Sequence, residues 1–247
     1  MLKFMQKHPF GVKAFFKQSV VLTFAFPKEI LGPLIPPCLT LDTFKDQWAF
    51  VAIAFVETEK LHPAFLPDFL GNSFILTGYR IFVRYHSKAG KRLRGLYILE
   101  SETNSKMMNF MGGMLTKYQY RFTDITIKNE GNRIFIESEQ SGYFADVLKH
   151  ENDAVKLPDQ SPFESWQEAR RFAGPLPFTF SYDAATQNVL IVEGVRENWK
   201  PQPLEIKNYS TGFFEKIKLG KPVLANAFII ENIPYQWKKG RIEKWHS

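Results

Sequence analysis

Apolar and polar residues alternate along several short segments of the chain, which is typical of β-strands with one buried face. Between residues 79 and 85, tyrosine and branched apolar residues alternate with arginine and phenylalanine. Segments 118–128 and 133–139 alternate too, and the turn residues between them predict a hairpin. Segment 48–56 is apolar at odd and even positions alike, so we expect a central strand that is covered on both sides.

The other predicted elements are short. Strands are expected at 19–26, 39–44, 96–102, 177–182, 188–196 and 224–230, and helical segments at 28–31, 104–116, 162–172 and 213–217. Residues 13–18 are interpreted as an amphipathic entry segment and 61–71 as a rigid loop, while 143–149 stay ambiguous. This pattern predicts a mostly β (α+β) protein with one domain over residues 1–247. We expect an antiparallel, curved or half-open β-barrel whose openings are covered by the two longer helices.

The composition provides for a large core and a basic surface. Of the 247 residues, 45% are hydrophobic and 15% aromatic, which excludes wholesale disorder. The net charge is +7, but Lys and Arg are spread along the chain apart from denser stretches at 88–94 and 238–244. Because nucleic-acid binders usually concentrate their charge on one surface, we expect no nucleic-acid partner. Binding of nucleic acid or another anion stays open as an alternative, through Lys88, Lys91, Arg92 and Arg94.

No common catalytic or metal-binding motif occurs in the sequence. The five histidines lack metal-ligand spacing, glycine-rich phosphate motifs are absent, and Cys38 is the single cysteine. We therefore expect no cofactor, no metal, and a buried, inert thiol at Cys38. The longest apolar runs, such as 20–26, are too short to span a bilayer. A cytoplasmic protein without a membrane partner is expected, and a homo-oligomer stays open.

One group of residues could carry chemistry. Glu100 and Glu102 share a strand face and Lys106 opens the next helix, so we expect all three to line a pocket at this junction. A lysine sheltered from water has a lowered pKa and can form a Schiff base with a ketone. Lys106 would then be the nucleophile, with Lys117 as second choice, and Glu100 or Glu102 would orient the substrate or move protons. The alternative is a strand end in solvent, with carboxylates near a helix N-terminus.

A second set of residues is expected to contact a ligand. Arg80 would hold a carboxylate, and Tyr118 and Tyr120 would supply further polar groups. Met108 belongs to a methionine-rich helix that could form the wall of a permissive site. Such methionines also serve as adaptable core packing, and that alternative stays open.

Several segments resemble a known family. Residues 26–57, FPKEILGPLIPPCLTLDTFKDQWAFVAIAFVE, resemble the opening of the YqjF-like family of uncharacterised proteins. Residues 79–83 resemble its arginine-centred strand, centred here on Arg80. Residues 95–99 with Ser105-Lys106 resemble its next strand and helix start, and 162–172 and 195–204 its later helix and turn. Lys106 stands where those relatives tend to have arginine.

This resemblance implies a fold of the acetoacetate decarboxylase-like superfamily, a cone-shaped, partly closed antiparallel barrel around an apolar cavity. The implied function is a cavity that binds a small apolar or carbonyl-bearing molecule. An alternative is a Schiff-base decarboxylase or related lyase that acts on a small keto acid. The decarboxylase carries adjacent lysines after the corresponding strand, and this sequence has no such pair.

Overall fold

The computed structural model describes residues 8–115, 118, 120–150, 155–172 and 176–245. Its strands are β1 (Val12–Pro27), β2 (Thr40–Leu41), β3 (Trp48–Pro63), β4 (Asn72–His86), β5 (Arg92–Thr103), β6 (Tyr120–Phe122), β7 (Thr126–Glu130), β8 (Arg133–Ser138), β9 (Tyr143–Lys149), β10 (Phe178–Asp183), β11 (Asn188–Arg196), β12 (Gln202–Thr211), β13 (Val223–Trp237) and β14 (Arg241–Lys244). The helices are α2 (Lys28–Leu31), α3 (Lys106–Leu115), α4 (Trp166–Phe172) and α5 (Phe213–Lys216), with 3-10 turns η1 (Gly32–Leu34) and η2 (Asp68–Leu70).

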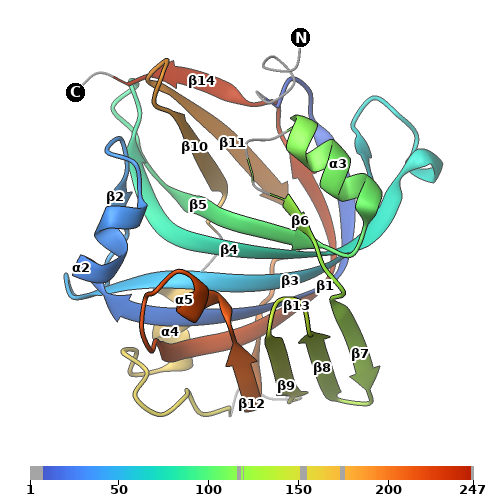
Figure 1. Ribbon diagram of the computed structural model, residues 1–247, viewed down its shortest axis with the longest axis vertical. Coiled ribbons are helices and arrows are strands. Elements are labelled where there is room, and N and C mark those ends of the chain that lie inside the picture. Colours follow the sequence, from blue (N-terminus) through green and yellow to red (C-terminus); the bar gives the residue numbers. More distant parts are fainter. Residues whose placement is uncertain (1–7, 116–117, 119, 151–154, 173–175, 246–247) are drawn as a thin grey trace.

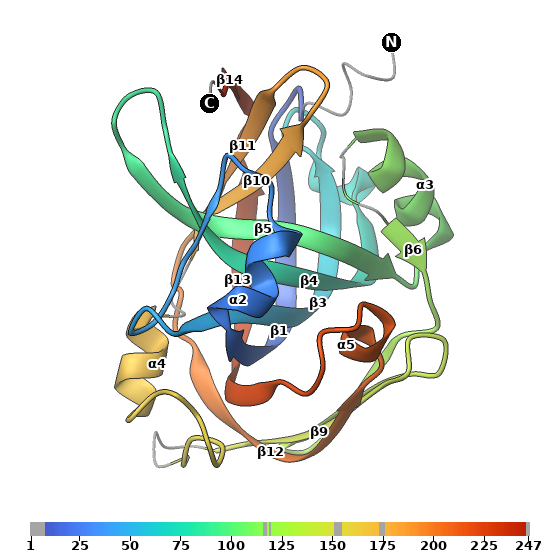
Figure 2. The ribbon, with the colours of Figure 1, turned by 60° about the vertical axis from the view of Figure 1, so that its left-hand side comes forward.

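The strands form one mixed sheet that curves into a ring. Its order in the described part of the chain is β14-β11-β10-β5-β4-β3-β1-β13-β12-β9-β8-β7. In addition, β11 pairs with β13, so that Arg196 lies opposite Tyr235 and the path β13-β1-β3-β4-β5-β10-β11 closes on itself (Figure 1). Beyond β13 the sheet continues through β12, β9, β8 and β7, which pack against the outer face of the ring (Figures 1 and 2). At the other end β14 pairs with β11, and β2 and β6 are added at β4 and β5.

The strands β1, β3 and β4 bury both faces. On the outer face, Phe55 of β3 packs on Tyr143 of β9, with ring centroids 4.3 Å apart, and Phe24 of β1 packs on Phe214 of α5. On the inner face, Phe50 stacks on Phe163, which precedes α4. The prediction that 48–56 forms a central strand covered on both sides is therefore confirmed, because residues 49–56 are all buried there. Burial on both faces explains why apolar residues occupy both parities.

Several element boundaries differ from the sequence predictions. The interpretation of 13–18 as an entry segment was wrong, since β1 begins at Val12 and pairs along its length with β3 and β13. β3 likewise continues into the expected loop as far as Pro63, with register shifts that absorb the bend. The strand expected at 39–44 is reduced to β2, and the one at 118–128 is divided into β6 and β7.

Other differences concern pairing and missed elements. The sheet is mixed, not purely antiparallel, because β5 pairs in parallel with both β6 and β10. β12 and β14 were not predicted, and the ambiguous segment 143–149 is β9. The longer helices were expected at 104–116 and 162–172 and span 106–115 and 166–172. None of the helices described has the length and apolar character needed to cross a bilayer.

Candidate functional site

Arg80 lies on β4 with its side chain on the inner face of the ring. Phe82 lies on the same face. The pairing of β4 with β5 shifts in register between Tyr79 and Arg80. A Cβ on Gly78 would lie 2.5 Å from Arg80 Nε, so the glycine leaves room for the guanidinium. Burial lowers the pKa of Arg80, and its buried Nε has no hydrogen-bond partner in the part of the chain that the structure describes. A buried cation without a counter-ion is costly, which marks this position as a candidate binding residue.

Tyr118 and Tyr120 lie beside Arg80. Their rings are 6.5 Å apart, and the charge of Arg80 opposes the effect of burial on the pKa of both phenols. Burial still raises the pKa of Tyr120 to about 12 and that of Tyr118 above its usual value. Tyr118 also shares a side-chain hydrogen bond with Ser181 of β10. The structure thus brings together three residues that the sequence analysis selected as ligand contacts.

Two residues of the opposite wall were not selected from the sequence. Tyr235 of β13 acts electrostatically on Arg80 and stacks on Phe16 with ring centroids 4.6 Å apart. Arg196 of β11 lies opposite Tyr235 in the strand pairing that closes the ring. No local sequence pattern marks Tyr235 and Arg196 as site residues, because only the pairing of β11 with β13 brings them near Arg80. Their side chains make the inner site cationic and aromatic.

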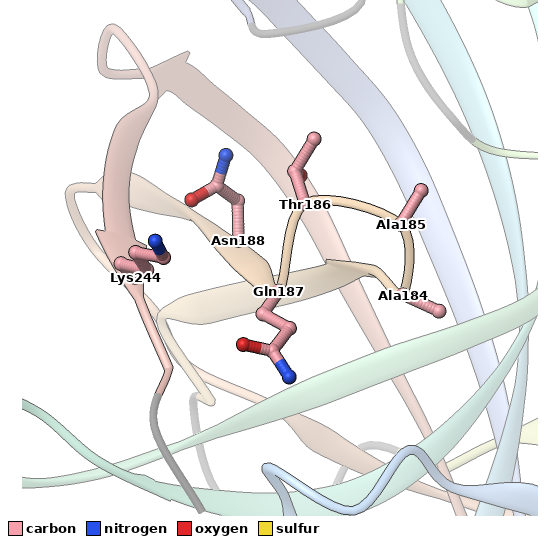
Figure 3. Close-up of a pocket in the computed structure, with 6 residues that line it drawn as sticks. All are labelled: Ala184, Ala185, Thr186, Gln187, Asn188 and Lys244. Carbon is pink, nitrogen blue, oxygen red and sulfur yellow. The ribbon is translucent and has the colours of Figure 1, made fainter.

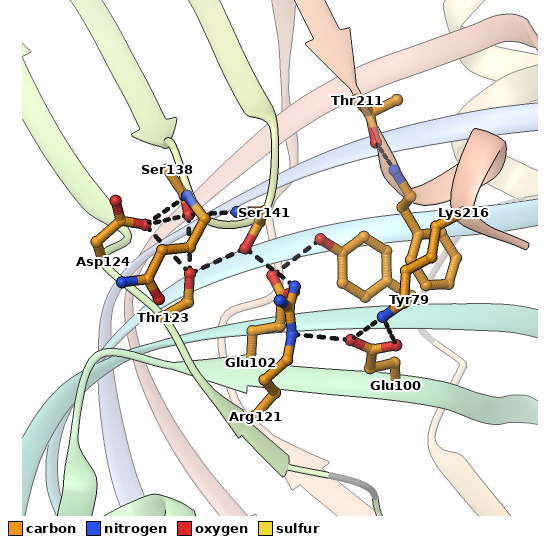
Figure 4. Close-up of polar contacts among 12 residues, drawn as sticks. Tyr79, Glu100, Glu102, Arg121, Thr123, Asp124, Ser138, Ser141, Thr211 and Lys216 are labelled. Atoms are coloured by element: carbon orange, nitrogen blue, oxygen red, sulfur yellow. Dashed lines mark hydrogen bonds and ion pairs between the residues drawn. The ribbon is translucent and has the colours of Figure 1, made fainter.

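A separate polar network lies on the outer face (Figure 4). Glu102 is 1% exposed, accepts a hydrogen bond of 2.9 Å from the Tyr79 hydroxyl and forms an ion pair with Arg121. Arg121 Nε also lies 3.2 Å from Glu100, whose carboxylate pairs with Lys216 Nζ at 2.7 Å. Around them is a pocket of about 240 Å³ lined by Tyr79, Glu102, Arg121, Gln140, Ser141, Gly142, Gly212, Phe213 and Lys216. Its charges are balanced within the network.

The network continues into the turn after β8 through hydroxyl groups. Thr123 Oγ1 lies 2.8 Å from Ser138 Oγ and 2.9 Å from Ser141 Oγ. Ser138 donates a hydrogen bond of 2.5 Å to Asp124, and this bond is the main reason why the pKa of Asp124 is lowered. These contacts fasten the β8–β9 turn to the segment between β6 and β7. We interpret them as structural support for the outer pocket.

The residues expected at a single junction are therefore divided. Glu102 lines the outer pocket and Glu100 is held beside it by Arg121 and Lys216, whereas Lys106 is exposed and its Nζ lies 5.7 Å from the centroid of the Phe122 ring. Among the described residues Lys106 has no hydrogen bond or ion pair. The Lys106 side chain is open to water, so the geometry does not give it the shelter that a Schiff-base nucleophile requires. Lys117 lies outside the described residues.

Ser105 caps the start of α3. Ser105 Oγ accepts a hydrogen bond of 3.2 Å from the Met108 backbone N–H, as an N-cap residue does. Met108 is half-buried on this helix. A Cβ on Gly112, one turn further on, would lie 2.5 Å from the Tyr120 ring. The helix can therefore approach the inner tyrosines because a glycine faces them.

The basic hairpin 88–94 contributes less free charge than the sequence indicated. Arg94 Nε lies 2.6 Å from the fully buried Asp42, which also pairs with Arg84. Arg94 Nη2 donates a further hydrogen bond to the Phe172 carbonyl. Arg94 thus ties the hairpin to the segment before β3 and to α4, and only the remaining residues of the hairpin are free to meet an anion.

A larger depression of about 600 Å³ lies at the turn between β10 and β11 (Figure 3). It is lined by Ala184, Ala185, Thr186, Gln187, Asn188 and Lys244. The labelled side chains point in different directions, and Lys244 is the single charged group among them. Such a surface has no converging polar groups, so we do not consider it a candidate site. No group of three His, Cys, Asp or Glu side chains that could hold a metal ion occurs among the described residues.

Comparison with known protein families assigns the chain to one of them. Residues 14–242 match the model of DUF2071, described as an uncharacterized conserved protein family. The protein belongs to this family. No curated protein matches the DUF2071 chain. Family and fold agree with the resemblance found in the sequence.

Solved structures show the same fold at low sequence identity. Acetoacetate decarboxylase from Legionella pneumophila superposes with a TM-score of 0.58 at 10% identity, covering 94% of this chain and 87% of that one. The enduracididine biosynthesis enzyme MppR, complexed with pyruvate, gives 0.57 at 9% identity, with 96% and 91% covered. An acetoacetate decarboxylase-like enzyme from Sphingomonas wittichii gives 0.54 at 12% identity, with 94% and 91% covered. The DUF2071 protein therefore has an acetoacetate decarboxylase-like fold.

Proposed function

We propose that the inner face of the ring binds a small molecule with an apolar body and a carbonyl or carboxylate group. The observation that carries this proposal is the guanidinium of Arg80, whose buried Nε has no hydrogen-bond partner among the described residues. A bound carboxylate would supply the missing counter-ion through charge-assisted hydrogen bonds. Tyr118 and Tyr120, which lie beside it, would offer hydroxyl donors to a neighbouring carbonyl oxygen.

The surroundings of Arg80 support an apolar ligand body. The inner face carries Phe16, Phe82 and many further apolar side chains, and α4 packs aromatic rings against it. Sites for small ligands combine such walls with a few placed polar groups. The likeness in fold to a structure complexed with pyruvate is consistent with a ligand of this class.

The two alternatives receive less support. A Schiff-base lyase that uses Lys106 needs a sheltered amine, and this side chain is exposed. A nucleic-acid surface on the hairpin 88–94 would have to do without Arg94, which is engaged by Asp42. No observation on the outer surface favours either function over the inner site.

The proposal is tested by isothermal titration calorimetry with 2-oxopentanoate and the neutral analogue 2-pentanone. We expect the wild-type protein to bind the oxo acid more tightly than the ketone, since Arg80 contacts the carboxylate. Arg80→Met should reduce oxo-acid affinity by about tenfold or more, the usual effect of a charge-assisted hydrogen bond. The exposed Arg92→Met is the matched control and should bind as wild type does. Equal affinity of Arg80→Met and wild type would refute the proposal.

A further inference from the structure

Arg196 is a second arginine of the inner site, and no described residue forms an ion pair with it. It ends β11, and its guanidinium carbon lies 3.9 Å from the centroid of the Trp199 ring and 5.8 Å from that of Tyr235. Arg196 Nη2 and Trp199 Nε1 are buried and have no hydrogen-bond partner in the described part of the chain. The cation–π contact fixes the guanidinium plane but leaves its N–H donors free for another acceptor.

Arg80 and Arg196 are close enough to influence one another. Burial lowers the pKa of Arg196, and the charge of Arg80 lowers it further. Their strands, β4 and β11, are not neighbours in the sheet, so the two side chains approach each other across the interior of the ring. Two like charges in aromatic surroundings are unfavourable without an anion between them.

The other arginines of the chain do not share this situation. Most pair with carboxylates: Arg84, Arg94, Arg121, Arg133 and Arg241. The rest are exposed to solvent: Arg92, Arg170 and Arg171. Arg80 and Arg196 alone combine burial of a guanidinium nitrogen with the lack of any hydrogen bond or ion pair to a described residue. Because of this contrast, we consider Arg80 and Arg196 as possible ligands of an external anion.

Two glycines make room for this arrangement. A Cβ on Gly194 would lie 2.0 Å from the Tyr235 hydroxyl oxygen, and one on Gly78 would lie 2.5 Å from Arg80 Nε. Gly194 is on β11 two residues before Arg196, on the same side of the strand. The polar ends of Tyr235 and Arg80 thus occupy space that any other residue type would fill.

We propose that Arg80 and Arg196 together form an anion site for a ligand with two negative charges, such as a small dicarboxylate. The inference rests on the proposed function and narrows its ligand class. Each guanidinium would bind one acidic group with its planar set of N–H donors, and Trp199 Nε1 would add a neutral donor beside Arg196. A dianion would offset both buried charges, whereas a monoanion would leave one unbalanced.

The test compares 2-oxopentanoate with 2-oxopentanedioate, which have the same carbon chain and differ by one carboxylate. Calorimetry on the wild-type protein should give an affinity for the dianion that is about 10- to 100-fold higher. Arg196→Met should remove most of this preference, so that the two acids bind this variant with affinities within about threefold of each other. Arg196→Lys, which keeps the charge without the fork of donors, should retain part of the preference. Arg92→Met serves as the exposed control.

The outcomes separate the two proposals. Binding of 2-oxopentanoate with no preference for the dianion would overturn the dianion site and leave the proposed function standing. Binding of neither acid, or the same affinities in Arg80→Met as in wild type, would overturn both. If Arg196→Met loses its native far-ultraviolet circular dichroism, Trp199→Phe replaces it. This variant keeps an aromatic ring beside Arg196, lacks the indole N–H, and should lose about threefold or more in dianion affinity; an unchanged affinity of Trp199→Phe would overturn the dianion site.

Discussion

Tyr79 and Arg80 are neighbours on β4, and their side chains lie on opposite faces of the ring. Tyr79 points outward and donates a hydrogen bond to the buried Glu102, while Arg80 points inward toward Tyr118 and Tyr120. Because side chains alternate between the faces of a strand, neighbouring residues can belong to an ion-pair network on one face and a cationic, aromatic group on the other. The charges of the outer network are balanced within the protein, whereas Arg80 has no hydrogen-bond partner among the described residues, and we propose that a ligand supplies one.

Arg121 should be important for stability. It is the cation that pairs with Glu102, which is 1% exposed. In Arg121→Met this carboxylate keeps the Tyr79 hydroxyl but loses its charged partner. We expect the free energy of unfolding in urea to fall by about 1–3 kcal/mol.

The matched control is Lys128→Met. This variant removes an ion pair with Glu137 in which both side chains are largely exposed. It should lower the free energy of unfolding much less than Arg121→Met does, because water and salt screen an exposed ion pair. Equal losses in the two variants would contradict the assignment of the Glu102 network as a buried structural element.

Gly95 should be essential for the parallel pairing of β5 with β10. A Cβ at this position would lie 2.2 Å from the Phe178 carbonyl oxygen, which belongs to the backbone and cannot turn away. Gly95→Ala should therefore destabilise the protein by about 1–3 kcal/mol or more in urea unfolding. Gly32→Ala, where a Cβ meets nothing within 4 Å, should be neutral or mildly stabilising. A neutral Gly95→Ala would show that β10 does not approach β5 so closely.

High pH should unfold the protein because it ionises tyrosines whose pKa is raised in the folded state. Burial raises the pKa of Tyr120 and of Tyr85 to about 12, the latter helped by a hydrogen bond to Glu243. Since a free tyrosine has a pKa near 10, the folded state holds these protons more tightly than the unfolded state. Their contribution to stability is complete below pH 10 and is lost as pH rises toward 12. Tyrosinate absorbance should therefore rise together with unfolding, and full ionisation near pH 10 with circular dichroism unchanged would contradict this.

Cys38 should react slowly with alkylating reagents. Its side chain is buried, and this burial raises the pKa of the thiol to about 11. Little thiolate is then present at pH 8, and access is restricted. Mass spectrometry after iodoacetamide treatment should show modification of denatured protein long before native protein. Equal rates would mean that the segment around Cys38 opens readily.

The sequence predicted those parts of the fold that depend on local pattern. The two apolar faces of 48–56 and the alternation around Arg80 identified β3 and β4, because period-2 spacing is visible within a few residues. β12 was missed since Pro203 and several polar residues interrupt its pattern, and its partners lie far away in sequence. Long strands such as β13 were cut short where residues 231–237 become polar or proline-containing, although pairing with β1 continues.

The candidate site was predictable only in part, for a similar reason. Arg80, Tyr118 and Tyr120 lie near one another because β4, β5 and α3 are consecutive in the chain. Arg196 and Tyr235 join them through the pairing of β11 with β13, which no local signal encodes. The alternation of side chains along β5 correctly predicted that Glu100 and Glu102 lie on one side. Lys106, at the start of α3, does not contact them, and the lysine that pairs with Glu100 is Lys216 from a distant segment.

The most direct test of the central claim is a crystal structure of the protein with 2-oxopentanoate. We predict that the carboxylate lies within hydrogen-bond distance, about 3 Å, of the Arg80 guanidinium on the inner face of the ring. A ligand in the outer pocket beside Glu102, or on the surface only, would contradict the account.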